Sequence, residues 1–119
     1  MNISDILIVD DNKSLTGAYD LLLAQHGFRV MTAEGGREAV RMCEGNHPAV
    51  AIVDLKMPDL DGPATILALQ KNAPTLKVIA VSGQMLSPYF ARLANLGVRH
   101  FLTKPFTFDS LLGEIGELL

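Results

Sequence analysis

Acidic and basic side chains follow the ends of separate apolar runs in this sequence. Asp10 and Asp11 come after the first run, Asp54 after the third, and the pair Lys104-Pro105 after the fifth. If these runs are strands of an open parallel sheet, their carboxyl ends meet at one crevice. Carboxylates that meet a lysine at such an edge predict a phosphoryl-transfer site, because they supply a nucleophile, metal ligands and a positive charge for phosphate.

The three carboxylates predict a divalent cation. Carboxylates held close together repel one another, and one of them takes up a proton unless a cation offsets the charge. Mg²⁺ fits this requirement because it prefers oxygen ligands and completes its coordination with water and phosphate. A local alternative stays open, in which Asp11 or Asn12 only caps the following helix and Asp54 only opens a turn.

Further polar residues lie at the same predicted edge. Ser82 follows the fourth apolar run, where its hydroxyl could donate to a phosphoryl oxygen, although Ser-Gly after a strand also forms simple turns. The Lys104-Pro105 bond is a candidate cis peptide. In the loop after Asp54, we expect Asp59 and Asp61 to be solvated turn residues.

The apolar runs alternate with stretches of helical period, which predicts β-α units around a buried parallel sheet. Strands are expected at residues 6–9, 28–32, 50–53, 78–81 and 99–102. Helices are expected at residues 12–26, 63–71, 88–96 and from 108 onward, and a further helix between the second and third strands is expected to stop at Gly45. Gly27 is expected to end the first helix in a left-handed conformation, and Thr107 to cap the last one.

The composition predicts one globular domain over residues 1–119. Of the 119 residues, 49% are hydrophobic and 19% are charged, which suits a single buried core. The net charge is −3 and the basic residues are scattered, so no basic patch for nucleic acid is expected. No apolar stretch reaches the roughly 18 residues of a membrane span, and the N-terminus lacks the basic start of a signal peptide. We therefore expect a cytoplasmic protein without a membrane span.

The remaining reactive side chains are predicted to be structural. Cys43 falls in a helical apolar pattern and is expected in the core. His26, His47 and His100 lie in separate elements without metal-ligand spacing, so we expect structural or surface positions for all three.

Taken together, these residues resemble the receiver domain of two-component response regulators. The resemblance rests on Asp-Asp after the first strand, Asp followed by Met-Pro and Asp-Gly after the third, Ser after the fourth and Lys-Pro after the fifth, and it extends over the whole chain. It implies an α/β fold with a doubly wound, five-stranded parallel sheet of order 2-1-3-4-5 and five helices, the flavodoxin-like arrangement of chemotaxis-type proteins.

The resemblance implies a role for each acidic site residue. Asp54 would be the phosphoacceptor, and Asp10 and Asp11 would hold Mg²⁺ together with Asp54 and the backbone carbonyl of Lys56. The domain would catalyse its own phosphorylation and dephosphorylation, as a signalling switch rather than a turnover enzyme.

Other positions would bind the phosphoryl group or respond to it. Ser82 and Lys104 would contact the group, and Phe101, three positions before the lysine, would take part in the switch by packing, since it lacks the hydroxyl of the commoner tyrosine. A plain core phenylalanine is the alternative for Phe101. Lys56 and Gln84 stand where family members tune the lifetime of the phosphoryl group.

The resemblance also implies partners. A histidine kinase or histidine phosphotransfer protein would donate the phosphoryl group, and a downstream protein target or output domain would bind the fourth helix, fifth strand and fifth helix. Tyr89, Phe90, Arg92 and Arg99 are expected contacts there, with one of the two aromatic residues in the core instead. The acidic and arginine positions of the winged-helix members' dimer are not matched, so that dimer is not expected.

Three alternatives belong to other classes. A nucleotide or flavin module would carry a glycine-rich phosphate loop, and the sequence has neither Gly-x-Gly-x-x-Gly nor Gly-x-x-x-x-Gly-Lys-Ser/Thr. A phosphatase with an aspartyl-phosphate intermediate usually needs an acid two residues after its nucleophile, where Lys56 stands. A receiver-like interaction module without phosphorylation is the third, and the complete set of site residues argues against it.

Overall fold

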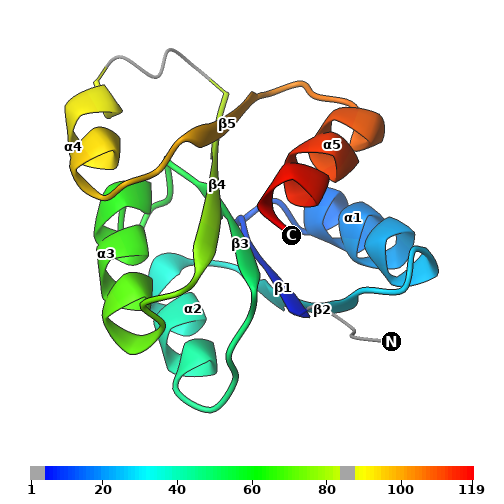
Figure 1. The fold of residues 1–119 in the computed structure, drawn as a ribbon, viewed down its shortest axis with the longest axis horizontal. Coiled ribbons are helices and arrows are strands. Elements are labelled where there is room, and N and C mark those ends of the chain that lie inside the picture. Colours follow the sequence, from blue (N-terminus) through cyan, green and yellow to red (C-terminus); the bar gives the residue numbers. More distant parts are fainter. Residues whose placement is uncertain (1–4, 84–87) are drawn as a thin grey trace.

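Strands and helices alternate to build a five-stranded parallel sheet with helices on both faces (Figure 1). The computed structural model describes residues 5–83 and 88–119. The strands run in the order β2-β1-β3-β4-β5. They are β1 (Asp5–Val9), β2 (Arg29–Ala33), β3 (Val50–Asp54), β4 (Lys77–Ser82) and β5 (His100–Thr103). This confirms the predicted doubly wound fold, and each predicted strand end differs from the observed one by no more than about one residue, within the usual uncertainty of strand ends.

The helices form two layers, as Figure 1 shows. One face of the sheet carries α1 (Lys13–Gln25) and α5 (Phe108–Leu118), and the other carries α2 (Gly36–Cys43), α3 (Gly62–Asn72) and α4 (Phe90–Asn95). Within the described part of the chain, no helix is long and apolar enough to cross a membrane.

The two faces have separate cores because side chains along a strand point alternately to either side. In β1, Ile6 and Ile8 pack with the α1 and α5 layer, whereas Leu7 and Val9 pack with the layer of α2, α3 and α4. Cys43 is 1% exposed, which confirms its predicted core position. Burial on both faces explains why the strands read as near-continuous apolar runs.

Local signals set most helix ends. The Asn12 side chain caps the start of α1, and the Thr107 side chain caps the start of α5. Gly27, with a φ of 91°, follows the C-cap residue of α1 and turns the chain away from the helix. Gly97 has a φ of 76° after α4, in a turn that the sequence reading did not single out. A residue without a Cβ adopts such left-handed angles without strain.

Helix α2 stops before Gly45, as predicted, but Gly45 does not take the positive φ that Gly27 has. The Glu44 N–H bonds to the Arg41 carbonyl in a tighter last turn. Helix α4 begins at Phe90 rather than at Pro88, which lies in a turn.

Substituting Gly36→Ala should destabilise the fold. A Cβ on Gly36 would overlap the Thr65 hydroxyl and lie 2.9 Å from the Leu60 Cβ, and Thr65 is fully buried. Overpacking of this kind costs about 1–3 kcal/mol of unfolding free energy, measured by urea unfolding followed by circular dichroism. Gly17→Ala in α1 is the matched control, since its Cβ would meet nothing within 4 Å, and it should stabilise the helix by about 0.5–1 kcal/mol. A Gly36→Ala protein as stable as the wild type would contradict this packing.

Candidate phosphoacceptor site

The carboxyl ends of four strands bring the predicted site residues to one edge of the sheet. Asp10 follows β1, Asp54 ends β3, Ser82 ends β4, and Lys104 follows β5. Asp10, Asp54 and Ser82 are 5%, 7% and 5% exposed, respectively, whereas Asp11 is exposed. The topology therefore places the buried polar groups of the sheet at a single crevice.

Backbone hydrogen bonds continue past the strands and hold these residues in place. The Asp10 N–H bonds to the Ala33 carbonyl at 3.0 Å, and the Lys104 N–H bonds to the Ser82 carbonyl at 2.8 Å. After Asp54, the Leu55 N–H bonds to the Val81 carbonyl at 2.9 Å. The hydrogen-bonded sheet thus extends one residue past the ends of β1, β3 and β5.

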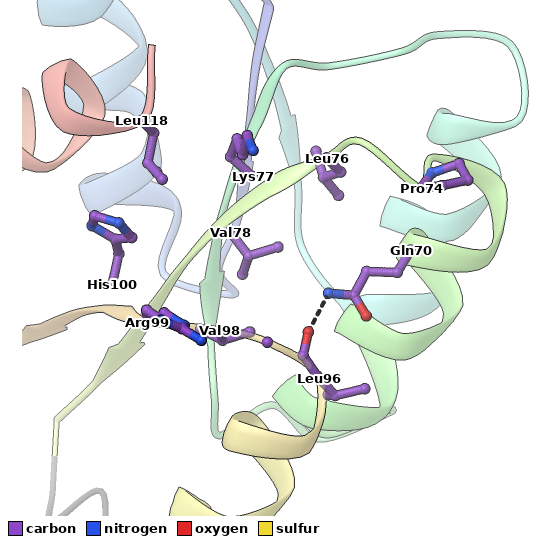
Figure 2. A pocket seen from close by; sticks show the side chains of 11 residues that line it. Gln70, Pro74, Leu76, Lys77, Val78, Leu96, Val98, Arg99, His100 and Leu118 are labelled. Carbon is purple, nitrogen blue, oxygen red and sulfur yellow. Dashed lines mark hydrogen bonds between the residues drawn. The ribbon is translucent and has the colours of Figure 1, made fainter.

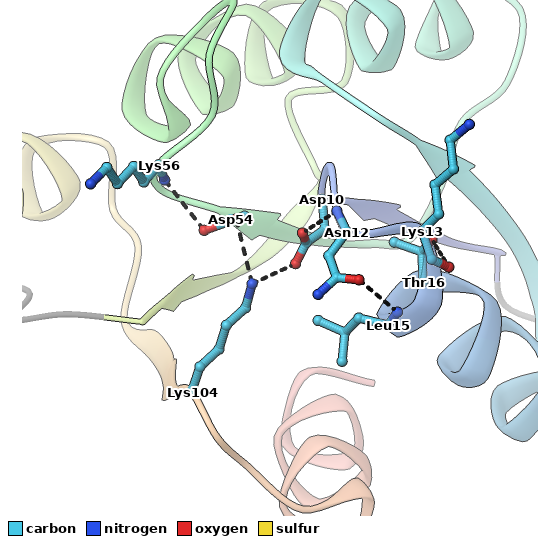
Figure 3. Close-up of polar contacts among 8 residues, drawn as sticks. All are labelled: Asp10, Asn12, Lys13, Leu15, Thr16, Asp54, Lys56 and Lys104. Atoms are coloured by element: carbon cyan, nitrogen blue, oxygen red, sulfur yellow. Dashed lines mark hydrogen bonds and ion pairs between the residues drawn. The ribbon is translucent and has the colours of Figure 1, made fainter.

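Lys104 joins the two buried carboxylates (Figure 3). Its Nζ lies 2.8 Å from Asp10 Oδ2 and 3.5 Å from Asp54 Oδ2. Burial alone would lower the pKa of Lys104, but the hydrogen bond to Asp10 and the charges of Asp10 and Asp54 leave the pKa above its ordinary value of 10.5. Lys104 therefore stays protonated and offsets part of the negative charge.

Burial disfavours the charge of the Asp54 carboxylate. Burial raises its pKa above the ordinary 3.8, and the Lys56 N–H, which donates to Asp54 Oδ1 at 3.3 Å, and the Lys104 ammonium oppose that shift. A buried carboxylate with an incomplete set of partners gains from a further cation.

The carboxylates have the donor chemistry of a Mg²⁺ site. Asp10, Asp11 and Asp54 each offer an oxygen, and these atoms all lie within 4.8 Å of one another. Asn12, and not Asp11, caps α1, because its Oδ1 accepts from the Leu15 N–H at 3.2 Å. The capping alternative for Asp11 is therefore wrong, and three hard oxygen donors match what Mg²⁺ requires.

A cavity opens beside Asp54. It has a volume of about 240 Å³ and is lined by Asp54, Lys56, Ser82, Gly83, Tyr89 and Lys104. The Asp54 carboxylate, a hydroxyl and an ammonium group thus face one space large enough for a phosphoryl group. The Lys104-Pro105 peptide bond, which the sequence marked as a candidate, is cis.

Of the two aromatic residues expected to contact a downstream partner, one is half-buried and the other is exposed. Tyr89 is half-buried against the core and lines the cavity, while Phe90 is 54% exposed. Phe101 is half-buried, and its ring stacks on Phe90 with 5.8 Å between centroids.

Two further predicted positions are polar. Arg99 is exposed, and Gln84 lies outside the described residues.

Asp59 and Asp61 lie in the loop before α3, and Asp59 is exposed there, as expected, but both also accept hydrogen bonds at helix starts. Asp59 accepts from the Gly36 N–H at 3.2 Å and the Arg37 N–H at 3.1 Å, so it caps α2 from a distant loop. These bonds, that to Arg37 first, lower the pKa of Asp59. The sequence could not show this contact, since the partners lie more than twenty residues away.

Asp61 joins two helices. Its Oδ1 accepts from the Ala64 N–H at 2.9 Å and caps α3, and Arg92 of α4 donates to both carboxylate oxygens at 2.9 and 3.3 Å. Partial burial of Asp61 opposes the effect of Arg92 and Ala64, which together lower its pKa. The Asp-Gly-Pro order at the helix start is a capping signal that sequence reading could have used.

Comparison with known proteins gives the family. Residues 6–116 match the family described as "Response regulator receiver domain". Over 114 residues, the chain is 33% identical to the transcriptional regulatory protein GlrR of Escherichia coli strain K12, covering 96% of this chain and 26% of GlrR. The chain spans about a quarter to a half of the length of such curated relatives.

Solved structures of response regulators have the same fold as this chain. A CheY-like receiver domain protein from Methanospirillum hungatei JF-1 superposes with a TM-score of 0.93 at 28% identity, covering 98% of this chain and 93% of that one. The response regulator TrrA from Thermotoga maritima, solved in complex with Mg(2+)-BeF, gives a TM-score of 0.84 at 26% identity and covers 98% of this chain and 100% of that one.

The chain therefore belongs to the response regulator receiver domain family of two-component systems. Phosphorylation, and Mg²⁺ binding at the phosphorylation site, are general properties of this family.

Replacing Lys104 should expose the charge repulsion of the site. Lys104→Met keeps the apolar stem but leaves Asp10 and Asp54 without their ammonium partner. In EDTA we expect a loss of about 1–2 kcal/mol in unfolding free energy, and added Mg²⁺ should narrow the gap to the wild type. The exposed control Lys71→Met should stay within about 0.5 kcal/mol. Equal stability of Lys104→Met and the wild type in EDTA would rule out this role for Lys104.

Replacing Asp61 should give a pH-dependent effect. Because its pKa is lowered in the folded state, the ionised carboxylate stabilises the fold above the ordinary pKa of 3.8, and this contribution is lost as the pH falls through the folded-state value. Asp61→Asn retains a capping side chain but loses the charge, so it should be less stable by about 0.5 kcal/mol at pH 7. Thermal unfolding from pH 7 down to about pH 3 should show the difference shrinking. A difference that grows toward low pH would contradict the assignment.

Proposed function

We propose that Asp54 is the phosphoacceptor of this receiver domain and accepts a phosphoryl group from a histidine kinase or histidine phosphotransfer protein. The observation that supports this most directly is the burial of Asp54 beside Lys104, in a cavity that Ser82 also lines. We take residues 1–119 as one receiver domain, because both β1 and α5 contribute to the same core.

The transfer is a substitution at phosphorus. A carboxylate oxygen of Asp54 forms the new O–P bond as the N–P bond to the donor imidazole breaks, and the imidazole leaves with the bonding electron pair. Lys104 already lies between Asp54 and Asp10, so its ammonium group can donate to a phosphoryl oxygen with little movement. Positioning and charge neutralisation supply most of the catalysis in such transfers.

Asp10, Asp11 and Asp54 would hold Mg²⁺, together with the backbone carbonyl of Lys56. The bound ion supplies positive charge next to the acceptor and the transferred group. Asp10 is already oriented for this, since its Oδ1 accepts from the Asn12 N–H at 2.9 Å and its Oδ2 faces Lys104.

Phosphorylation would act on the neighbouring elements through charge. The modification adds about −1.5 to −2 charges, which would draw the Ser82 hydroxyl and Lys104 toward it. Phe101 lies on β5, which pairs with the strand that ends at Ser82, and its ring stacks on the exposed Phe90. Its packing can therefore pass a change at β4 and β5 to the surface of α4. A downstream protein or output domain would bind this surface of α4, β5 and α5.

Two positions would tune the lifetime of the aspartyl phosphate. The exposed Lys56 lines the cavity and can influence the approach of water. Gln84, two residues after Ser82, is assigned the same role from its place in the sequence.

Incubation with acetyl phosphate and Mg²⁺ tests the proposal. Intact mass spectrometry should show one added phosphoryl group on the wild type and none on Asp54→Asn, because the amide cannot act as the nucleophile. Asp109→Asn makes the same substitution at an exposed position of α5 and should still be labelled. A folded wild type without a Mg²⁺-dependent adduct would overturn the proposal and favour an interaction module without phosphorylation. An adduct that survives in Asp54→Asn would show that Asp54 is not the phosphoacceptor.

A further inference from the structure

A histidine and two glutamates meet at the opposite end of β5 from the phosphoacceptor. His100 begins β5, and Glu114 and Glu117 lie one turn apart on α5. His100 Nδ1 is 2.8 Å from Glu114 Oε2 and 3.7 Å from Glu117 Oε2. One nitrogen or oxygen from each residue lies within 4.8 Å of the other two.

The main chain holds these side chains on two regular elements. Leu111 and Ile115, on the inner face of α5, are 0% and 1% exposed, which fixes the helix against the sheet. The side chains of His100 and Glu114 are 24% and 27% exposed, and that of Glu117 is 70% exposed. The cluster is therefore anchored on its inner side and open to solvent on its outer side.

The cluster has an excess of negative charge. Glu114 and Glu117 are like charges three residues apart on a helix, an arrangement that costs stability unless a cation offsets it. Among the residues that the structure describes, His100 is the only ion-pair partner of either glutamate. Figure 2 shows His100 at the border of a cavity of about 340 Å³, near Leu118 of α5 and away from Lys77.

We propose that His100, Glu114 and Glu117 form a binding site for a transition-metal cation, with Zn²⁺ as the ion that the donors favour. An imidazole nitrogen with two carboxylate oxygens suits Zn²⁺ and not Mg²⁺. Tetrahedral Zn²⁺ with bonds of about 2.0–2.2 Å places its ligand atoms about 3.3–3.6 Å apart, and the separations of 2.8 and 3.7 Å lie on either side of this range. Water can fill the fourth position from the exposed side.

The site is separate from the phosphoacceptor and does not depend on its assignment. Four residues of strand separate His100 from Lys104, about 13 Å at the usual rise per residue. Sequence spacing gave no sign of the site because its ligands come from a strand and a helix, fourteen residues apart. A bound ion would tie β5 to α5.

Zinc titration of the whole chain in saturating Mg²⁺ tests the site. Calorimetry should give one Zn²⁺ per chain with a Kd in the range of about 1–100 μM. NMR of the imidazole nitrogens should show the His100 signals shifting while those of His26 and His47 stay, which provides two internal controls.

Variants identify the ligands. His100→Ala and Glu117→Gln should each weaken Zn²⁺ binding by about tenfold or more, and the exposed Glu117 can be changed without disturbing the fold. The matched controls His47→Ala and Glu44→Gln, both exposed, should bind as the wild type does. No binding up to about 1 mM Zn²⁺, or wild-type binding in both His100→Ala and Glu117→Gln, would show that the cluster is only a hydrogen-bonded ion pair.

Discussion

Repulsion among carboxylates is the constraint on which this domain depends. Parallel strands that end at one edge bring Asp10 and Asp54 together in a buried crevice, with Asp11 beside them. Within residues 5–83 and 88–119, one ammonium group, that of Lys104, bridges the two buried acids. The edge therefore favours a hard cation beside the carboxylates. A phosphoryl group suits such an edge, because the cation and the Lys104 ammonium group can both neutralise its negative charge.

The loop after β3 connects this site to the layer of α2, α3 and α4. Asp59 caps α2, and Asp61 caps α3 while pairing with Arg92 of α4. At its other end, α4 is bonded to α3 through Gln70, whose Nε2 donates to the Leu96 carbonyl. A change in this loop can thus reach three helices through hydrogen bonds that the structure already contains.

Features that depend on neighbours in sequence were predictable, and features that depend on the fold were not. The strands could be read from their apolar runs, and the α5 cap from Thr107, because these signals act within a few residues. The roles of Asp59 and His100 could not, since their partners are distant in the chain and become neighbours only when helices pack on the sheet. The meeting of Asp10, Asp54 and Lys104 was predictable because parallel topology sends every strand end to one edge. Tyr89 and Phe90 could not be told apart, because the start of α4 sets the helical phase.

A Mg²⁺ titration followed by two-dimensional NMR is the most direct test of the central claim that these strand ends form one cation-dependent acceptor site. The account predicts saturable shifts confined to the amides that flank Asp10, Asp54 and Lys104, with further shifts there when beryllofluoride is added to mimic the phosphoryl group. An absence of shifts in a folded sample, or weak unsaturated shifts spread over the whole acidic surface, would contradict it.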